Sequence, residues 1–222
     1  MSATESRPSP VTLRTARRLP LRLAWLYTGL TGFGLSIALL VRARMGLDPW
    51  DVLHQGIARH LGVQIGWVVI GVSALVLLAW IPLRQRPGLG TVSNAVVVGL
   101  VVNEALRIIP APEALLPRAA MLAAAIVANG LATACYIGAG LGPGPRDGLM
   151  TGLAARGHSI RAVRTAIELS VLVAGVILGG SAGIGTIAYA VSIGPLVQFL
   201  LPRLSLAAQP GQAKQRQAAQ PT

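Results

Sequence analysis

The residues best suited to chemistry in this sequence are two aspartates, Asp51 and Asp147. Each stands third in a short segment that begins with proline. A carboxylate in the first turn of a helix is stabilised by the helix dipole and by free backbone N–H groups, by about 0.3 to 1 kcal/mol. That structural role is one interpretation. The other is functional: two broken helices whose N-termini meet inside a membrane form a site for an anionic group, or a proton-coupled pair of carboxylates.

Other polar residues fall in or beside apolar segments and are candidates for the same site. Glu104 and Asn103 lie inside one apolar run, where a carboxylate at the centre of a spanning helix costs roughly 2.5 kcal/mol or more. Arg107, three residues on, offers Glu104 an ion pair as the alternative to a place on a path. A lone histidine such as His54 is more typical of a hydrogen-bonded structural residue than of a proton relay. The predicted solute or ion path comprises Asp51, Asp147, Glu104, Asn103, Pro49, Pro145, Arg146 and His54.

The remaining motifs argue against a cofactor, a metal ion or an enzyme. Cys135 is the single cysteine and has no partner at metal-ligand spacing. The Gly-x-Gly-Thr stretches at 88–91 and 183–186 lack the Lys-Ser/Thr of a phosphate-binding loop, and their threonines, Thr91 and Thr186, are expected to be helix N-caps. No nucleophile stands beside a base. We therefore expect no catalytic residues, no metal and no cofactor.

The two aspartates belong to an internal repeat. Over positions 46–58, six of 13 residues recur at an offset of 96, and after a one-residue slip the match continues at an offset of 95. The chain is therefore two copies of a unit of about 95 residues. The predicted divisions are a basic cytoplasmic tail at 1–22, a first copy at 23–110, a second copy at 111–202 and a disordered cytoplasmic tail at 203–222.

The composition is that of an integral membrane protein, with 53% hydrophobic and 12% charged residues. The net charge of +12 does not predict nucleic-acid binding, because the basic residues lie between apolar runs and in the tails. Trp25, Trp67 and Trp80, near the ends of spans, are expected to be interfacial anchors. The lipid bilayer is thus the expected partner. The predicted spans are 23–41, 65–83, 92–109, 118–139, 162–180 and 184–202.

Two short helices are predicted at 49–61 and 145–156, between a starting proline and a terminating glycine. About 12 residues cover only about 18 Å, too little to cross a bilayer, so both are expected to be re-entrant or interfacial. Three spans per copy is an odd number, which inverts the second copy relative to the first. The predicted fold is an all-α membrane protein with six transmembrane helices in two inverted three-span repeats. If both short helices crossed, the repeats would be parallel and the spans eight.

The distribution of basic residues predicts that both termini are cytoplasmic. Cytoplasmic loops are enriched in Lys and Arg, and the six-span topology puts 14 of the 19 basic residues on that side. The eight-span topology gives the same total with a different set. Only the length of the short helices therefore favours six spans.

The paired motifs resemble the YczE/YitT-type family of bacterial integral membrane proteins, and its YczE-like branch in particular. The similarity rests on Gly-Leu-Asp-Pro-Trp-Asp-Val-Leu at 46–53, Gly-Pro-Gly-Pro-Arg-Asp-Gly-Leu at 142–149 and the two Gly-x-Gly-Thr turns. It extends from about residue 22 to about residue 202. The resemblance implies a multi-span protein of the bacterial inner membrane. It carries over no ligand or catalytic residue.

Two functions are compatible with this organisation. The first is a small secondary transporter built on inverted repeats, which moves a small solute past the aspartate pair. The alternative is a membrane helper, a partner-binding subunit of another system that transports nothing itself. A bundle of six spans is a small body, so a homo-oligomer is compatible with either function.

Overall fold

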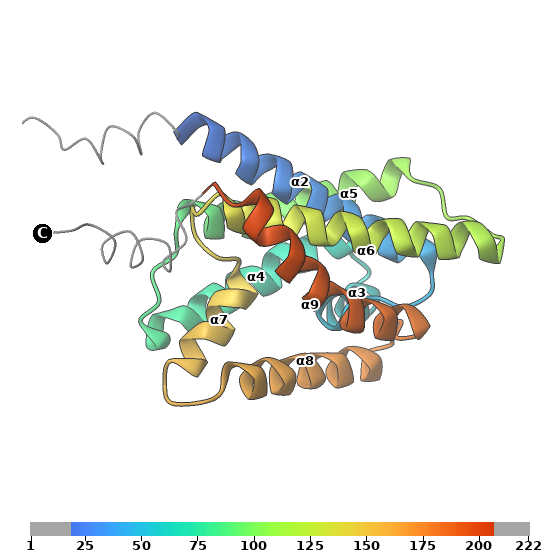
Figure 1. Ribbon diagram of the computed structural model, residues 1–222. Helices are drawn as coiled ribbons and strands as arrows, with labels where there is room; N and C mark the ends of the chain where they lie inside the picture. The colour runs from blue at the N-terminus through green and yellow to red at the C-terminus, as the bar shows by residue number, and fades with distance from the viewer. Residues whose placement is uncertain (1–18, 207–222) are drawn as a thin grey trace, which may run out of the picture.

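The structure is a computed structural model that describes residues 19–206 (Figure 1). The predicted tails lie largely outside the described residues, although the first helix already begins at Leu19, inside the stretch predicted as a tail. Within 19–206 the chain forms helices and no strand, as the apolar runs predict. The helices are α2 (Leu19–Ala43), α3 (Pro49–Leu61), α4 (Ile65–Leu83), α5 (Leu89–Ile108), α6 (Leu115–Gly138), α7 (Pro145–Ala154), α8 (Ile160–Ile177) and α9 (Ile184–Leu204).

Five of these helices, α2, α4, α5, α6 and α9, are long and apolar enough to cross a membrane. Five of the six predicted spans are thereby confirmed as candidate crossings. The sixth, α8, has 18 residues and carries Arg161, Arg164 and Glu168 in its first half. Its charges, and not its length, set it apart from the other five.

The short helices form where the Pro and Gly signals predict them. Asp48 caps α3 by accepting hydrogen bonds from the backbone N–H groups of Trp50 and Asp51, and Gly62 ends the helix in the left-handed conformation at φ +65°. Helix α7 starts at Pro145 but ends at Ala154, two residues before the predicted end.

The prediction for the threonines of the two Gly-x-Gly-Thr turns is wrong in detail. The N-caps are Gly88 and Gly183. Thr91 and Thr186 stand three residues further on and accept hydrogen bonds from those glycine N–H groups, at 3.2 and 3.1 Å. In a capping box of this kind the threonine side chain, three residues inside the helix, accepts from the N–H of the N-cap residue, whereas an N-cap threonine would accept from an N–H further along the helix.

Helices α2 and α6, at equivalent places in the two copies, run antiparallel and pack along each other (Figure 1). At one end Arg22 of α2 donates to the carbonyl of Ala139 at 2.7 Å, just beyond the end of α6. At the other end Arg118 of α6 donates to the carbonyl of Ala43 at 2.9 Å, at the end of α2. Both arginines satisfy carbonyl groups that a helix C-terminus leaves free.

Each copy is also tied to the turn of the other copy. The N–H of Gly185 donates to the Met45 carbonyl at 2.7 Å, and the N–H of Gly90 donates to the Leu141 carbonyl at 2.8 Å. The glycines that follow the two acceptors, Gly46 and Gly142, have φ of +115° and +122°, values that favour glycine. The motif glycines are therefore needed where the copies interlock.

Both ends of each short helix contact the same turn. Before α3 begins, the N–H of Leu47 donates to the carbonyl of Ser181, and near the end of α3 Arg59 donates to the carbonyl of Gly179. Both acceptors lie between α8 and α9. Helix α7 contacts the segment between α4 and α5 by packing: Gly142, before α7, lies beside Gly88, and Gly152, near its end, lies beside Gln85. Each short helix thus has both ends beside one turn of the other copy.

Helices α4 and α5 pack tightly, whereas the equivalent helices α8 and α9 do not. Gly66 and Gly99 bring the backbones of α4 and α5 together, and the Gly66 N–H donates to Oδ1 of Asn103 at 2.8 Å. Helix α8 packs instead on α3 and α7 (Figure 1). Gly194, the α9 counterpart of Gly99, has no neighbouring atom within 4 Å of an added Cβ in the part of the chain that the structure describes.

Candidate functional site

A cavity of about 250 Å³ lies where the N-terminal ends of α3 and α7 meet. Its lining comes from both copies, often from equivalent positions. Val69 and Ser73 of α4 lie on one side, and their counterparts Arg164 and Glu168 of α8 lie on the other. Further equivalent pairs in the lining are Pro49 with Pro145, Trp50 with Arg146, Asn94 with Tyr189, Val98 with Ile193 and Phe33 with Asn129.

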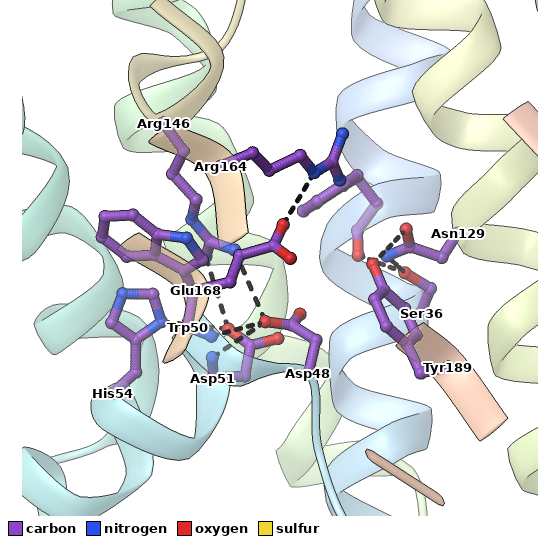
Figure 2. A network of polar contacts seen from close by, with 11 residues as sticks. Ser36, Asp48, Trp50, Asp51, His54, Asn129, Arg146, Arg164, Glu168 and Tyr189 are labelled. Atoms are coloured by element: carbon purple, nitrogen blue, oxygen red, sulfur yellow. Dashed lines mark hydrogen bonds and ion pairs between the residues drawn. The ribbon is translucent and has the colours of Figure 1, made fainter. Parts of the chain in front are cut away.

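Trp50 and Arg146, which both line the cavity, contact each other across the two copies. They occupy equivalent positions in the two copies, and the Arg146 guanidinium lies over the Trp50 ring, 5.2 Å from its centroid (Figure 2). This cation–π contact joins the N-terminal ends of α3 and α7.

The first copy contributes a buried carboxylate pair. Asp48 and Asp51 are 3% and 0% exposed. Arg146 from the second copy lies 3.4 Å from Oδ1 of Asp51 and 3.7 Å from Oδ1 of Asp48 (Figure 2). Buried carboxylates are tolerated when they are paired in this way. The Asp48–Asp51–Arg146 cluster is thus a polar contact between the copies.

His54 extends this cluster along α3. Its Nδ1 lies 2.9 Å from Oδ1 of Asp51, and the ring is 1% exposed. In the neutral tautomer that carries its proton on Nδ1, the histidine donates this hydrogen bond to the carboxylate and Nε2 has the lone pair. The histidine is a hydrogen-bonded residue of the core and not a surface group.

Burial in the loop before α3 also affects Asp48. Desolvation raises the pKa of its carboxyl group to about 7, and the neighbouring Asp51 adds to the increase, while Arg146 opposes it. Burial thus brings the pKa of Asp48 close to neutral pH.

Four polar atoms of this cluster are buried without a hydrogen-bond partner among residues 19–206. They are Oδ2 of Asp48, Oδ2 of Asp51, Nε1 of Trp50 and Nε2 of His54. Asp48 and Trp50 line the cavity. Because buried polar groups are nearly always hydrogen-bonded, unpartnered atoms in a cavity wall indicate a place where a ligand binds.

The second copy contributes Asp147, which has a different environment. Its Oδ2 accepts a hydrogen bond from the hydroxyl of Tyr136 at 2.8 Å. Within the described range no Lys, Arg or His lies within ion-pair distance of its carboxylate. Asp147 thus faces the cavity as a carboxylate without a cationic partner.

Polar residues of the spans form the rest of the wall. The hydroxyl of Tyr189 donates to Asn129 at 2.9 Å, and Asn129 donates to Ser36 at 2.8 Å (Figure 2). Nε of Arg164 lies 2.8 Å from Oε1 of Glu168 on α8, as their four-residue spacing predicts. This pair lines the cavity but is partly exposed, with 55% of the Arg164 side chain and 32% of the Glu168 side chain accessible.

The structure brings most of the predicted path residues together and separates two of them. Asp51, His54, Arg146, Pro49, Pro145 and Asp147 lie at or directly behind the cavity wall. Asn103 is 4% exposed and binds Gly66 between α4 and α5. Glu104 is 62% exposed, pairs with Arg107 at 2.7 Å and does not line the cavity.

Sequence reasoning missed several residues of the site. Asp48, Tyr136, Asn129 and Tyr189 are not among the predicted path residues. Only Tyr189 has a polar residue, Asn94, at the equivalent position of the other copy, so the repeat gives a signal for Tyr189 alone. Trp80 is not an interfacial anchor, because it is 2% exposed and donates to the Pro145 carbonyl at 3.1 Å. Its ring covers Gly148, where any side chain would clash with it.

Comparison with known proteins assigns the chain to a family. The model of a family described as "Family of unknown function (DUF6198)" matches residues 20–202. The chain belongs to this family. Relatives within reach of sequence comparison include an "Uncharacterized protein" of Haemophilus influenzae, 43% identical over 169 residues, which are 76% of this chain and 78% of the relative.

A second relative is the "Uncharacterized membrane protein YczE" of Bacillus subtilis, 31% identical over 191 residues, which are 84% of this chain and 88% of the relative. The resemblance to the YczE-like branch is therefore confirmed. No solved structure matches the chain. Together with the five long apolar helices, this relationship makes the chain a multi-pass membrane protein.

Proposed function

We propose that the chain is a small secondary transporter of the inner membrane, with both termini in the cytoplasm, that moves a small solute through the cavity between α3 and α7. The observation that carries the proposal is the composition of that cavity: the N-terminal ends of two broken helices, one from each copy, meet there beside buried charges. Secondary transporters bind their substrates at such helix interruptions between repeats.

The interlocking of the copies supports an inverted topology with six crossings. The guanidinium of Arg118 bonds to the carbonyl of Ala43. With eight crossings these two residues would lie on opposite faces of the membrane, because α3 would add a crossing between them. With six crossings they lie on the same face. The return of each short helix to one turn supports the same topology.

The charges in the cluster support a function beyond packing. Charged groups inside a membrane protein are costly and are usually paired or used. Asp51 and Arg146 are paired across the copies, but Asp147 lacks a cationic partner among the described residues and faces a cavity. A carboxylate in this position fits a binding role better than a structural one.

The unequal packing of the copies supports alternating access. Helices α4 and α5 pack closely through glycine contacts, whereas their counterparts α8 and α9 do not pack on each other in this way. If the two copies exchange these arrangements, the cavity opens first to one side of the membrane and then to the other. Inverted repeats make the two states similar in energy, because in each state one copy makes the contacts that the other copy makes in the second state.

A flux measurement tests the proposal. Proteoliposomes that contain the full chain and a trapped pH-sensitive dye are exposed to guanidinium, methanesulfonate or glycine, one probe for each charge class. We expect at least one probe to drive proton movement. Asp51→Asn and Asp147→Asn should slow that movement at least about tenfold, equivalent to ~1.4 kcal/mol in barrier height.

Glu113→Gln is the matched control, because it removes one carboxylate from an exposed loop residue and should leave the flux unchanged. If no probe moves protons, or if both aspartate variants match the wild type, the transporter proposal is wrong. A protein that fails this test but copurifies with a defined partner would be the helper subunit that the sequence also allows.

A further inference from the structure

The charges around the cavity are predominantly negative. Its lining includes three carboxylates, from Asp48, Asp147 and Glu168, and two guanidinium groups, from Arg146 and Arg164. A fourth carboxylate, that of Asp51, contacts Arg146 directly behind the wall. With these groups ionised, the acidic ones exceed the basic ones by two. A cavity of one charge sign attracts solutes of the opposite sign.

Several of the groups that could hold an anion are already engaged by the protein. Two of the N–H groups at the start of α3 donate to Oδ1 of Asp48, at 2.9 and 3.0 Å. Arg146 is shared between Asp48 and Asp51, and Arg164 is paired with Glu168. At these groups an anion would have to displace a carboxylate. The start of α7 has no side-chain cap among the described residues, but the carboxylate of Asp147 lies in its first turn and faces the cavity.

Two of the unpartnered buried atoms belong to residues that line the cavity. They are Oδ2 of Asp48, an acceptor, and Nε1 of Trp50, a donor, neither with a partner among residues 19–206. Oδ2 of Asp51 and Nε2 of His54 belong to residues behind the cavity wall. Asp48 is 97% buried, since its exposed fraction is 3%. An N–H group of a cationic ligand would supply the donor that Oδ2 of Asp48 lacks.

Aromatic rings complete the environment. Trp50, Tyr136, Tyr189 and Phe33 all line the cavity, and aromatic faces bind organic cations. We infer that the cavity binds a small organic cation, with Asp48 and Asp147 as its carboxylate partners. This inference rests on the proposed transport function and names the class of solute.

Binding measurements on the purified full chain in detergent test this assignment. The probes are guanidinium, its neutral isostere urea, tetramethylammonium and methanesulfonate, each titrated by calorimetry at a pH above 7, where Asp48 is ionised. We expect the cations to bind with dissociation constants of about 1 mM or tighter. Urea and methanesulfonate should bind at least about tenfold more weakly, because neither carries the positive charge.

Asp48→Asn and Asp147→Asn should each weaken cation binding about tenfold, and Glu113→Gln should not. Asparagine still caps a helix and still accepts a hydrogen bond from Tyr136, so both variants are expected to fold, which their thermal unfolding midpoints check. The assignment is overturned if methanesulfonate binds as tightly as the cations. It is also overturned if neither cation binds, or if both aspartate variants bind cations as the wild type does.

These results are separable from those of the flux experiment. If guanidinium binds and depends on Asp147, but no probe moves protons, the cation site stands and the transporter proposal fails. If methanesulfonate alone drives flux, the transporter proposal stands and the cation assignment fails.

Discussion

In the first copy of the repeat, Gly66 and Gly99 let α4 and α5 touch backbone to backbone, and Asn103 bonds across the contact. In the second copy the same positions hold Arg161, Gly194 and Gln198. No comparable packing of α8 on α9 is present in the part of the chain that the structure describes.

The comparison shows that the two copies differ in helix packing where they differ in sequence, at Gly66 of the first copy and Arg161 of the second. Arg161, which has a long, charged side chain, stands where the first copy has Gly66, and in this structure α8 does not pack on α9 as α4 packs on α5. Gly194, the counterpart of Gly99 on α9, has no atom of the described residues within 4 Å of an added Cβ. The two copies therefore share a sequence pattern but differ in how their helices pack, and the cavity lies between the copies.

The largest expected effect comes from alanine at the two equivalent glycines. In Gly99→Ala the added Cβ clashes with the carbonyl oxygen of Gly66, so the free energy of unfolding should fall by about 2 to 3 kcal/mol. In Gly194→Ala the Cβ enters open space. The gain in helix propensity there is offset by the following Pro195, so the change should be below about 1 kcal/mol. Unfolding in mixed micelles measures both, and equal losses would contradict the proposed difference.

For each pH unit a smaller effect is expected from pH, because only the first copy has a carboxyl group at its cap. Asp48 corresponds to Gly144. The folded-state pKa of Asp48, about 7, exceeds its ordinary value of 3.8, so the folded chain binds this proton more tightly than the unfolded chain. Stability should therefore fall as the pH rises from about 4 to about 7, by at most about 1.4 kcal/mol per pH unit, and then level off.

The control for this prediction is Asp48→Asn, which keeps the cap but cannot titrate. The groups that act on Asp48 are Asp51 on its own helix, Arg146 from α7 and Tyr189 from α9. Unfolding midpoints measured across that pH range should lose their slope in the variant. A slope that persists unchanged would assign the pH dependence to another group.

The smallest effect is expected from removing the amide that bridges α4 and α5. Asn103→Leu leaves the Gly66 N–H without its acceptor, but it also removes Nδ2 of Asn103, which is buried without a partner in the described structure. The two changes partly cancel, so we expect a loss of about 1 kcal/mol. Gln198→Leu, at the equivalent position, should change stability by less than half as much. The same micelle unfolding assay compares them, and a larger loss at 198 would reverse the comparison.

The local elements could be predicted from the sequence because their signals are local. Apolar runs of about 20 residues predict spanning helices, and Pro49, Gly62 and Pro145 mark where short helices start or stop. The predictions failed where contacts between residues distant in sequence determine the position of a side chain. Trp80 looked like an anchor at the end of a span, but Gly148 of the other copy provides a site in which its ring is buried.

By itself, the sequence determined the repeat, the membrane class and the two short helices with their aspartates, because each follows from composition and periodicity along the chain. Only the tertiary structure decided that Arg146 lies between Asp48 and Asp51, that Asp147 has Tyr136 as its partner, and that Glu104 lies outside the cavity. Those relations join residues about 95 positions apart or set one helix face against another, and they depend on how the two copies interlock.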